Sequence, residues 1–188
     1  LPPHHRSRLT FDLDSTVVTV FGHQNGAAVG YNPRYRGKRS YCPLLCMEAN
    51  SSYLWGAQLR SGNIGTWHGS LELLDACLAH VPSDVRELRA LADSGFAFDP
   101  VLATLEEMKA EYAVVARFTA GLRNRVRGLR YQSVNRDWQM ADCEYRAEGW
   151  SHPRRFVVAR QFIAPSDPQP TLFTMGHYAY RAWIADLK

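Results

Sequence analysis

The sequence has no apolar run that approaches the ~18 residues of a membrane-spanning helix. Its start also lacks the pattern of a secretory signal peptide, a basic stretch followed by an apolar one. There is no internal repeat and no low-complexity segment, which argues against solenoid and disordered architectures. We therefore expect a cytoplasmic protein with no membrane partner.

Cysteine and lysine are both scarce. Cys42 and Cys46 are not accompanied by a second Cys or His pair at the spacing of a zinc site. The cysteines lie among apolar residues, so we expect buried thiols in a reducing compartment: Cys42, Cys46, Cys77 and Cys143. The only lysines are Lys38, Lys109 and Lys188, so arginine supplies most of the 22 basic residues.

The composition that remains is that of a globular protein. A chain of 188 residues with 46% hydrophobic and 21% charged residues can bury a substantial core. Its net charge of +4 and pI near 9.0 make it mildly basic, which permits an anionic partner.

Residues 8–21 are predicted to form a strand, because apolar and polar side chains alternate along them. The alternation places Asp12 and Asp14 on one face, roughly 6–7 Å apart along the backbone. A buried carboxylate needs a cation or hydrogen-bond donors, so this pair indicates a metal, a phosphoryl group or a basic partner. The alternative is that one Asp caps a turn and the other is solvated at an edge. The opposite face is apolar and predicted to be core: Leu9, Phe11 and Leu13.

The following elements are predicted from periodicity and from turn residues. Ser70 and Asp99 are expected to act as N-caps of two helices. The order is two strands, a helix, a strand, a helix and a buried parallel strand: 40–48, 52–59, 70–80, 86–92, 99–108 and 112–117. Beyond them, three strand-like runs and an exposed turn at 165–170 predict an antiparallel β insertion: 139–146, 155–163 and 171–184.

This order predicts an α/β fold in two parts. Residues 8–117 would form a mixed sheet, a three-strand meander joined to parallel strands with helices on its faces. Residues 118–188 would form the β-rich insertion. Because ligands of such sheets bind at the carboxyl ends of strands, Asp14 and Asp93 would meet there if their strands are neighbours.

Two stretches are basic and free of acids. Between Asp14 and Glu48 there is no Asp or Glu, and tyrosines accompany the basic residues of this loop: Arg34, Arg36, Lys38 and Arg39. Between residues 118 and 136 five arginines accumulate: Arg123, Arg125, Arg127, Arg130 and Arg136. Both stretches either bind the phosphate backbone of a nucleic acid or form solvated faces.

Five motifs in order carry a resemblance to a known family. They are Asp12-Leu13-Asp14-Ser15-Thr16, Gly22-His23-Gln24, Tyr41-Cys42-Pro43-Leu44-Leu45, Leu59-Arg60-Ser61-Gly62-Asn63 and Leu88-Arg89-Ala90-Leu91-Ala92-Asp93-Ser94-Gly95-Phe96. Together they resemble the DDE transposases of bacterial insertion sequences, the transposase DDE domain group 1. Leu91 stands where the family's second motif usually has Arg.

The resemblance implies an RNase H-like fold and DNA transposition by cleavage and strand transfer. Asp14 matches the first catalytic acid and Asp93 the second, and Asp12 is a further candidate metal ligand. Mg²⁺ or Mn²⁺ is the implied cofactor, and the partner is DNA, with a homodimer expected for the full-length protein near the nucleoid. The third acid, a Glu on a later helix, is expected outside this chain, so this piece alone is expected to be inactive.

Two other functions fit parts of the pattern. Asp12-Leu13-Asp14-Ser15-Thr16 also resembles the opening motif of haloacid-dehalogenase-type phosphatases, in which Asp12 would be the nucleophile and Asp14 the acid/base. The extended Val17–Phe21 segment and the scarcity of lysine fit that family poorly. The third possibility is a DNA-binding remnant without catalysis.

Overall fold

The computed structural model describes residues 7–65, 67–163 and 174–187. The chain divides into two compact units, Leu1–Tyr112 and Ala113–Lys188, and each is described by itself. The predicted turn at 165–170 lies outside the described residues.

The first unit contains a mixed sheet with the strand order β6-β5-β1-β7. β1 is antiparallel to β5 and parallel to β7, so the first strand and the strand before Asp93 are neighbours, which is the condition for their acids to meet. β5 and β6 form the antiparallel hairpin of the predicted meander. The strands are β1 (Arg8–Ser15), β5 (Leu44–Glu48), β6 (Tyr53–Gln58) and β7 (Glu87–Ala92).

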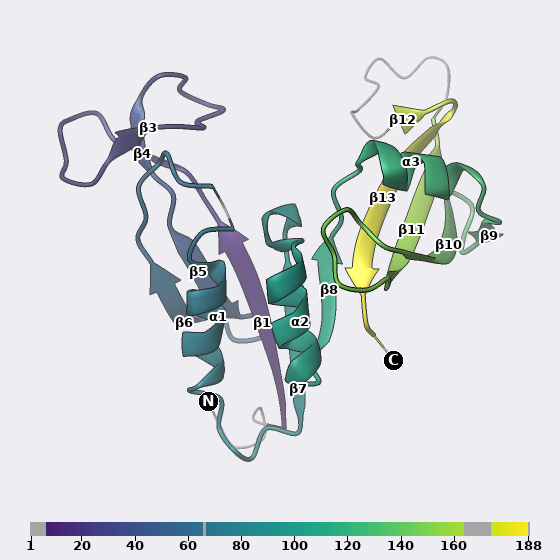
Figure 1. Cartoon of the computed structure of the whole chain (residues 1–188), viewed down its shortest axis with the longest axis horizontal. Helices are drawn as coiled ribbons and strands as arrows, with labels where there is room; N and C mark the ends of the chain where they lie inside the picture. Colours follow the sequence, from purple (N-terminus) through teal and green to yellow (C-terminus); the bar gives the residue numbers. More distant parts are fainter. Residues whose placement is uncertain (1–6, 66, 164–173, 188) are drawn as a thin grey trace. The chain divides into compact units, whose positions relative to one another are not determined.

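The core of this unit lies on one face of β1, as the alternation predicts. Leu9, Phe11 and Leu13 are buried, whereas Asp12 and Asp14 are exposed. Two helices, α1 (Ser70–Leu78) and α2 (Asp99–Glu107), contact each other, and α1 packs on β5 and β6 (Figure 1). The helical spacing of Val101, Leu102, Leu105 and Met108 predicts the inner face of α2; the first three are buried, whereas Met108, just after the helix, is exposed.

A small second sheet interrupts the meander, and two predicted strands are each divided by it. The prediction of one strand over 8–21 is wrong, because β1 ends at Ser15 and β2 (Val18–Thr19) pairs elsewhere. The prediction over 40–48 is also wrong, since β4 (Arg39–Tyr41) and β5 are separated at Pro43, which has no N–H for a ladder. β4 lies between β2 and β3 (Ala28–Val29), and all pairs are antiparallel.

Both predicted helix caps are off by one residue. Gly69 caps α1 in the left-handed conformation at φ 76°, and Ser70 is the first helical residue, its hydroxyl donating to the Trp67 carbonyl. Phe98 precedes α2, so Asp99 is the first helical residue. An acid there still favours the helix, because it faces the positive end of the helix dipole.

The second unit is an antiparallel sheet in the order β8-β13-β11-β10-β9, with β12 beside β13. β8 pairs with β13 in the antiparallel direction, and the prediction of a fully buried strand at 112–117 is wrong, because only alternate residues of β8 are buried. The strands are β8 (Glu111–Val115), which begins in the first unit, β9 (Gln132–Ser133), β10 (Trp138–Tyr145), β11 (Arg154–Phe162), β12 (Thr174–Met175) and β13 (Tyr178–Ala185).

A helix that the sequence pattern did not predict, α3 (Ala120–Arg127), contacts β10. Thr119 caps it by accepting a hydrogen bond from the Leu122 amide at 3.3 Å. Leu122 and Val126, four residues apart, are its two buried side chains. Two apolar positions among three arginines and an asparagine gave too weak a periodic signal to predict a helix.

All four cysteines are buried and free, as expected for thiols. Contact with Cys77 and burial raise the pKa of the Cys46 thiol. No helix in the described part of the chain has both the length and the apolar character needed to cross a bilayer.

Candidate active site

The sheet of the first unit brings the two predicted catalytic acids to adjacent positions. β1 and β7 are parallel, and their last paired residues are Leu13 and Ala92. Asp14 and Asp93 each follow directly after this pair. Neighbouring strands are about 4.8 Å apart, and paired residues point to the same face. The two carboxylates therefore leave neighbouring strands at the carboxyl edge of the sheet.

Backbone amides orient one oxygen of each carboxylate. The Ser15 N–H donates to Asp14 Oδ1 at 2.8 Å, and the Gly95 N–H donates to Asp93 Oδ1 at 2.7 Å. Asp93 caps the short 3₁₀ helix η2 (Ser94–Phe96), whose Phe96 is fully buried and fixes the turn after β7. Both carboxylates are exposed to solvent, so they remain accessible to a cation or substrate.

Asp12 lies two residues before Asp14 on the same exposed face of β1. Its neighbours across the ladders are Met47 of β5 and Leu91 of β7, both without charge. Leu91 is 42% exposed, so this face of the sheet is open around the acids.

The donor atoms at this edge match a hard divalent cation but supply an incomplete set. Carboxylate oxygens are the ligands that Mg²⁺ and Mn²⁺ prefer. Within residues 7–65, 67–163 and 174–187, however, no three His, Cys, Asp or Glu side chains cluster closely enough to hold a metal. Asp14 and Asp93 fit a metal as two of its ligands, and further ligands must come from water, substrate or another acid.

The predicted basic loop is part of the small sheet in the same unit. Arg34, Arg36, Lys38 and Arg39 are all exposed. Arg39 lies in β4, and its guanidinium donates to the Ala27 carbonyl at 3.0 Å. The other three basic residues lie in the loop that precedes β4.

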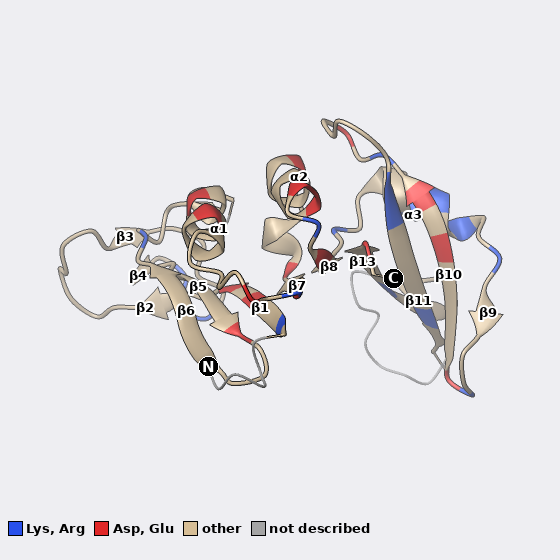
Figure 2. Ribbon diagram, turned by 90° about the horizontal axis from the view of Figure 1, so that it is seen from below, with Lys and Arg blue, Asp and Glu red and all other residues tan. Residues whose placement is uncertain are grey.

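The predicted arginine run lies in the second unit, and part of it forms α3. Arg125 and Arg127 are exposed in the last turn of this helix, and Arg123 is half-buried. Figure 2 shows the basic residues of α3 in blue. Cations in a last turn also stabilise the helix by facing the negative end of its dipole.

Arg60 is a buried residue to which the sequence pattern assigned no role, although it belongs to one of the five motifs. It is 6% exposed and its guanidinium donates to the carbonyls of Cys42, Gly65 and His68. The residue after Cys42, Pro43, accepts a hydrogen bond from the amide of Thr16, two residues after Asp14. Arg60 therefore supports the end of β1. The sequence did not indicate that Arg60 is buried, because a single Arg in a motif carries no periodic pattern.

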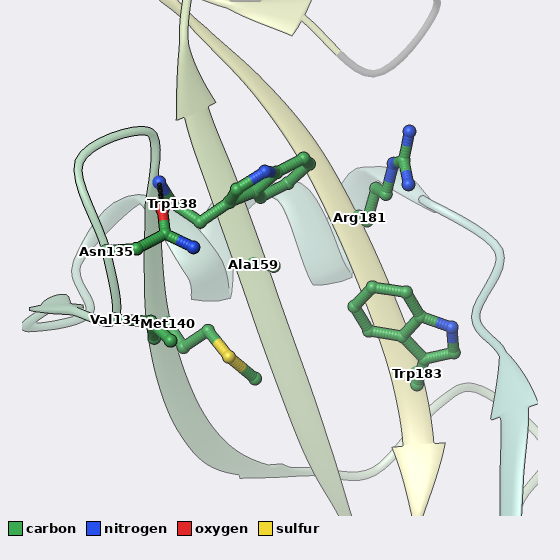
Figure 3. A pocket seen from close by; sticks show the side chains of 7 residues that line it. All are labelled: Val134, Asn135, Trp138, Met140, Ala159, Arg181 and Trp183. Atoms are coloured by element: carbon green, nitrogen blue, oxygen red, sulfur yellow. Dashed lines mark hydrogen bonds between the residues drawn. The ribbon is translucent and has the colours of Figure 1, made fainter.

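The second unit has an open hollow of about 250 Å³ on the sheet, drawn in Figure 3. Trp138, Arg181 and Trp183 border it, and the Arg181 guanidinium lies 5.2 Å from the centroid of the Trp138 ring. Asn135 closes one side by accepting a hydrogen bond from the Trp138 amide at 2.9 Å. No carboxylate lines the hollow, so it offers no metal ligands.

Both the sequence and the fold of the chain are similar to those of known proteins. The family model described as transposase DDE domain group 1 matches residues 3–178. No curated protein matches the chain. Six chains of solved structures match, among them piggyBac transposase in a synaptic complex with hairpin DNA, determined by cryo-EM.

The alignment with piggyBac transposase has a TM-score of 0.50 and 13% identity, and covers 95% of this chain and 34% of that one. At this identity the likeness shows the fold, a mixed α/β architecture of the RNase H-like type. The chain thus spans about a third of the length of this structural relative.

Proposed function

The chain belongs to the transposase DDE domain group 1 family, and from this premise we propose that it cleaves DNA strands and transfers them with Asp14 and Asp93 as two catalytic acids. The observation that carries the proposal is the parallel register of β1 and β7, in which both acids follow the Leu13–Ala92 pair. Acids on neighbouring strands at one edge can share a cation.

In this proposal the residues of the chain bind and orient. Asp14 and Asp93 hold a divalent ion, and the amides of Ser15 and Gly95 keep each carboxylate in place. A bound Mg²⁺ or Mn²⁺ supplies Lewis-acid stabilisation of charge on the reacting phosphate. Asp12, on the same face, is a further ligand candidate.

The basic residues hold the DNA. The piggyBac structural relative is a synaptic complex with hairpin DNA, and the acid-free loop with Arg34, Arg36, Lys38 and Arg39 suits a phosphate backbone. Arg123, Arg125 and Arg127 of α3 form a second such surface. We also propose that the full-length protein acts as a homodimer on an element of the bacterial insertion-sequence kind.

Residues 1–188 alone are proposed to be inactive or nearly so. Within the described residues only two acids meet at the edge, and a third carboxylate is needed to complete the metal site of this family. Metal binding by the chain should therefore be measurable but weak.

A Mn²⁺ titration followed by water-proton relaxation tests the proposal. Asp14→Asn and Asp93→Asn are each expected to weaken Mn²⁺ binding about ten-fold or more, because each removes a charged ligand. Asp84→Asn is the matched control and should bind as the wild type, because this exposed Asp precedes β7 and so lies at the opposite end of that strand from Asp93. Unchanged binding in either of the first two variants would refute the shared site.

A nicking assay with supercoiled plasmid separates the rival functions. In a protein that joins residues 1–188 to a segment supplying the third carboxylate, Mg²⁺-dependent nicking should occur and both Asn variants should abolish it. Retained DNA binding without any metal-dependent product would instead indicate a non-catalytic DNA-binding protein. Turnover of a small phosphomonoester that depends on Asp12 would indicate a phosphatase.

A further inference from the structure

The loops that join the strands of the small sheet expose three aromatic side chains, two of which contact each other. Phe21 and Tyr31 are 75% and 80% exposed, and Tyr35 is 40% exposed. The rings of Phe21 and Tyr35 meet edge to face with centroids 5.7 Å apart, and the Arg34 guanidinium lies 5.5 Å from the Tyr35 centroid. We name Phe21, Tyr31, Arg34 and Tyr35 the aromatic tip. Clustered apolar surface left in water indicates a binding surface more often than isolated exposed residues do.

The charge around the aromatic tip has one sign. No Asp or Glu occurs from Ser15 to Met47, whereas Arg34, Arg36 and Lys38 lie within five residues. None of these three forms an ion pair with any residue that the structure describes. Their charge is therefore uncompensated locally and complementary to a polyanion.

The aromatic tip is held in place by buried polar contacts. Asn32 is 5% exposed; its amide donates to Thr19 Oγ1 at 2.8 Å and its carbonyl accepts from the Tyr35 amide at 2.9 Å. At Gly30, a Cβ would lie 1.9 Å from the Gly62 carbonyl oxygen, so the backbones of two loops pack directly against each other. Such preorganisation lowers the entropy that a binding surface loses when it is occupied.

The aromatic tip lies at the same end of the first unit as the two acids. β2 begins at Val18, four residues after Asp14, and Figure 1 shows the small sheet at the end toward which β1 points. A strand of DNA whose phosphate reaches Asp14 and Asp93 would therefore lie at the end of the unit that carries the aromatic tip.

We propose that the aromatic tip binds single-stranded DNA next to the cleaved phosphate. Phe21 and Tyr35 stack on unpaired bases, while Arg34, Arg36 and Lys38 contact the adjoining phosphates. Aromatic faces stack on bases that have left the duplex, since paired bases offer only their edges in the grooves. The inference rests on the proposed function and adds to it a preference for unpaired bases.

Fluorescence anisotropy with a labelled single strand and a duplex of the same length tests the inference. Phe21→Ala combined with Tyr35→Ala should weaken single-strand binding about ten-fold or more, because each lost stack contributes substantially to affinity. Duplex binding and the salt dependence should stay unchanged, because no charge is removed. Tyr53→Ala, at an exposed tyrosine of β6, is the matched control and should change neither.

The charge variants give the complementary pattern. Arg36→Gln combined with Lys38→Gln should weaken single-strand and duplex binding alike and lower the salt dependence. Equal single-strand affinity in wild type and the aromatic double variant, or an equal loss for both DNA forms, would overturn the inference. If the double Ala variant melts at a lower temperature, Phe21→Leu combined with Tyr35→Leu decides, because it keeps apolar bulk and removes the aromatic faces.

The inference and the proposed function fail separately. The Asp14→Asn and Asp93→Asn variants should bind both oligonucleotides in EDTA as the wild type does. Suppose that those variants lose Mn²⁺ binding but the aromatic variant binds the single strand as the wild type does. This result would support the metal site at Asp14 and Asp93 and would refute only the binding of single-stranded DNA by the aromatic tip.

Discussion

Glu48 is a buried carboxylate at the turn between β5 and β6, and its partners explain its charge. It is 2% exposed and accepts hydrogen bonds from the Ser51 hydroxyl at 2.6 Å, the Ser51 amide at 2.8 Å and the Asn50 side chain at 2.9 Å. Burial opposes ionisation, but these hydrogen bonds outweigh it and hold the pKa of the Glu48 carboxyl below its usual range. The acid closes a turn and is separate from the edge that carries Asp14.

Replacing Glu48 by Gln should give a pH-dependent loss of stability. A carboxyl whose folded pKa is lower than its unfolded value of 4.5 stabilises the fold above that value. The stabilisation is lost as the pH falls through the folded pKa. At neutral pH we expect Glu48→Gln to lower the free energy of unfolding by about 1–3 kcal/mol.

Urea unfolding at neutral and at strongly acidic pH measures this difference, which should shrink in acid. Glu107→Gln, at an exposed acid of α2, is the control and should cost little at either pH. A deficit for Glu48→Gln that is equally large in acid would contradict the assigned role.

Arg60 makes the second residue-specific prediction. Lysine at this position keeps the charge but cannot reach three carbonyls with one planar group. Arg60→Lys should lower the free energy of unfolding by about 2 kcal/mol. It should also speed hydrogen exchange at the Cys42 and Gly62 amides, which bond to the carbonyls of Arg60 and Ser40. Arg86→Lys, at an exposed position, should change neither measurement.

The contact between α1 and β6 depends on a missing side chain. A Cβ at Gly56 would lie 2.6 Å from Cys77 Sγ and 3.2 Å from Leu73 Cδ1. The Trp55 indole also donates to the Cys77 carbonyl at 3.0 Å, so the strand and the helix meet closely at this point. A larger side chain therefore fits neither on the strand nor on the helix at this contact.

Gly56→Ala is expected to push α1 off the sheet and to cost about 1–3 kcal/mol of unfolding free energy. Adding Cys77→Ala should recover part of the loss, because it removes the atom that the new methyl meets. Chemical unfolding of the two single variants and the double variant measures this coupling. Strictly additive losses would show that the contact is not the cause.

Among the helices and strands, those that the sequence predicts well have an uninterrupted periodic pattern of apolar residues. The face of β1 and the buried residues of α2 follow from alternation and from helical spacing. Pro43 marks a strand break that the prediction placed inside a strand, and the loop after Ser15 left no apolar signal of a second sheet. α3 was missed because charged residues outnumber its two buried positions.

For the whole chain, the acids and the second basic surface belong to different compact units. DNA retention through α3 and metal binding through Asp14 and Asp93 should therefore be separable by mutation. The motifs predict that Asp14 and Asp93 act together, whereas the sheet edge that they share follows from the register of β1 and β7, which depends on contacts between segments far apart in the sequence.

Removing charge from α3 should reduce duplex binding in a salt-dependent way. For Arg125→Gln combined with Arg127→Gln, the slope of log K against log salt should fall by about 1 per arginine, because fewer counterions are released. Filter binding over a salt series measures the slope. Arg155→Gln is the control, since Asp142 already pairs with Arg155 at 3.0 Å. An unchanged slope in the α3 variant would assign these arginines to a solvated face.

Asp14 and Asp93 are proposed to bind one metal ion together. Iron-directed cleavage of the protein backbone tests this most directly. Fe²⁺ bound in place of Mg²⁺ generates hydroxyl radicals in the presence of ascorbate and peroxide, and these cut the nearest peptide bonds. We expect cuts around residue 14 and around residue 93 in the same molecule, both lost in Asp14→Asn or Asp93→Asn and both kept in Asp84→Asn. Cuts near only one of the two acids, or cuts that survive their replacement, would contradict the account.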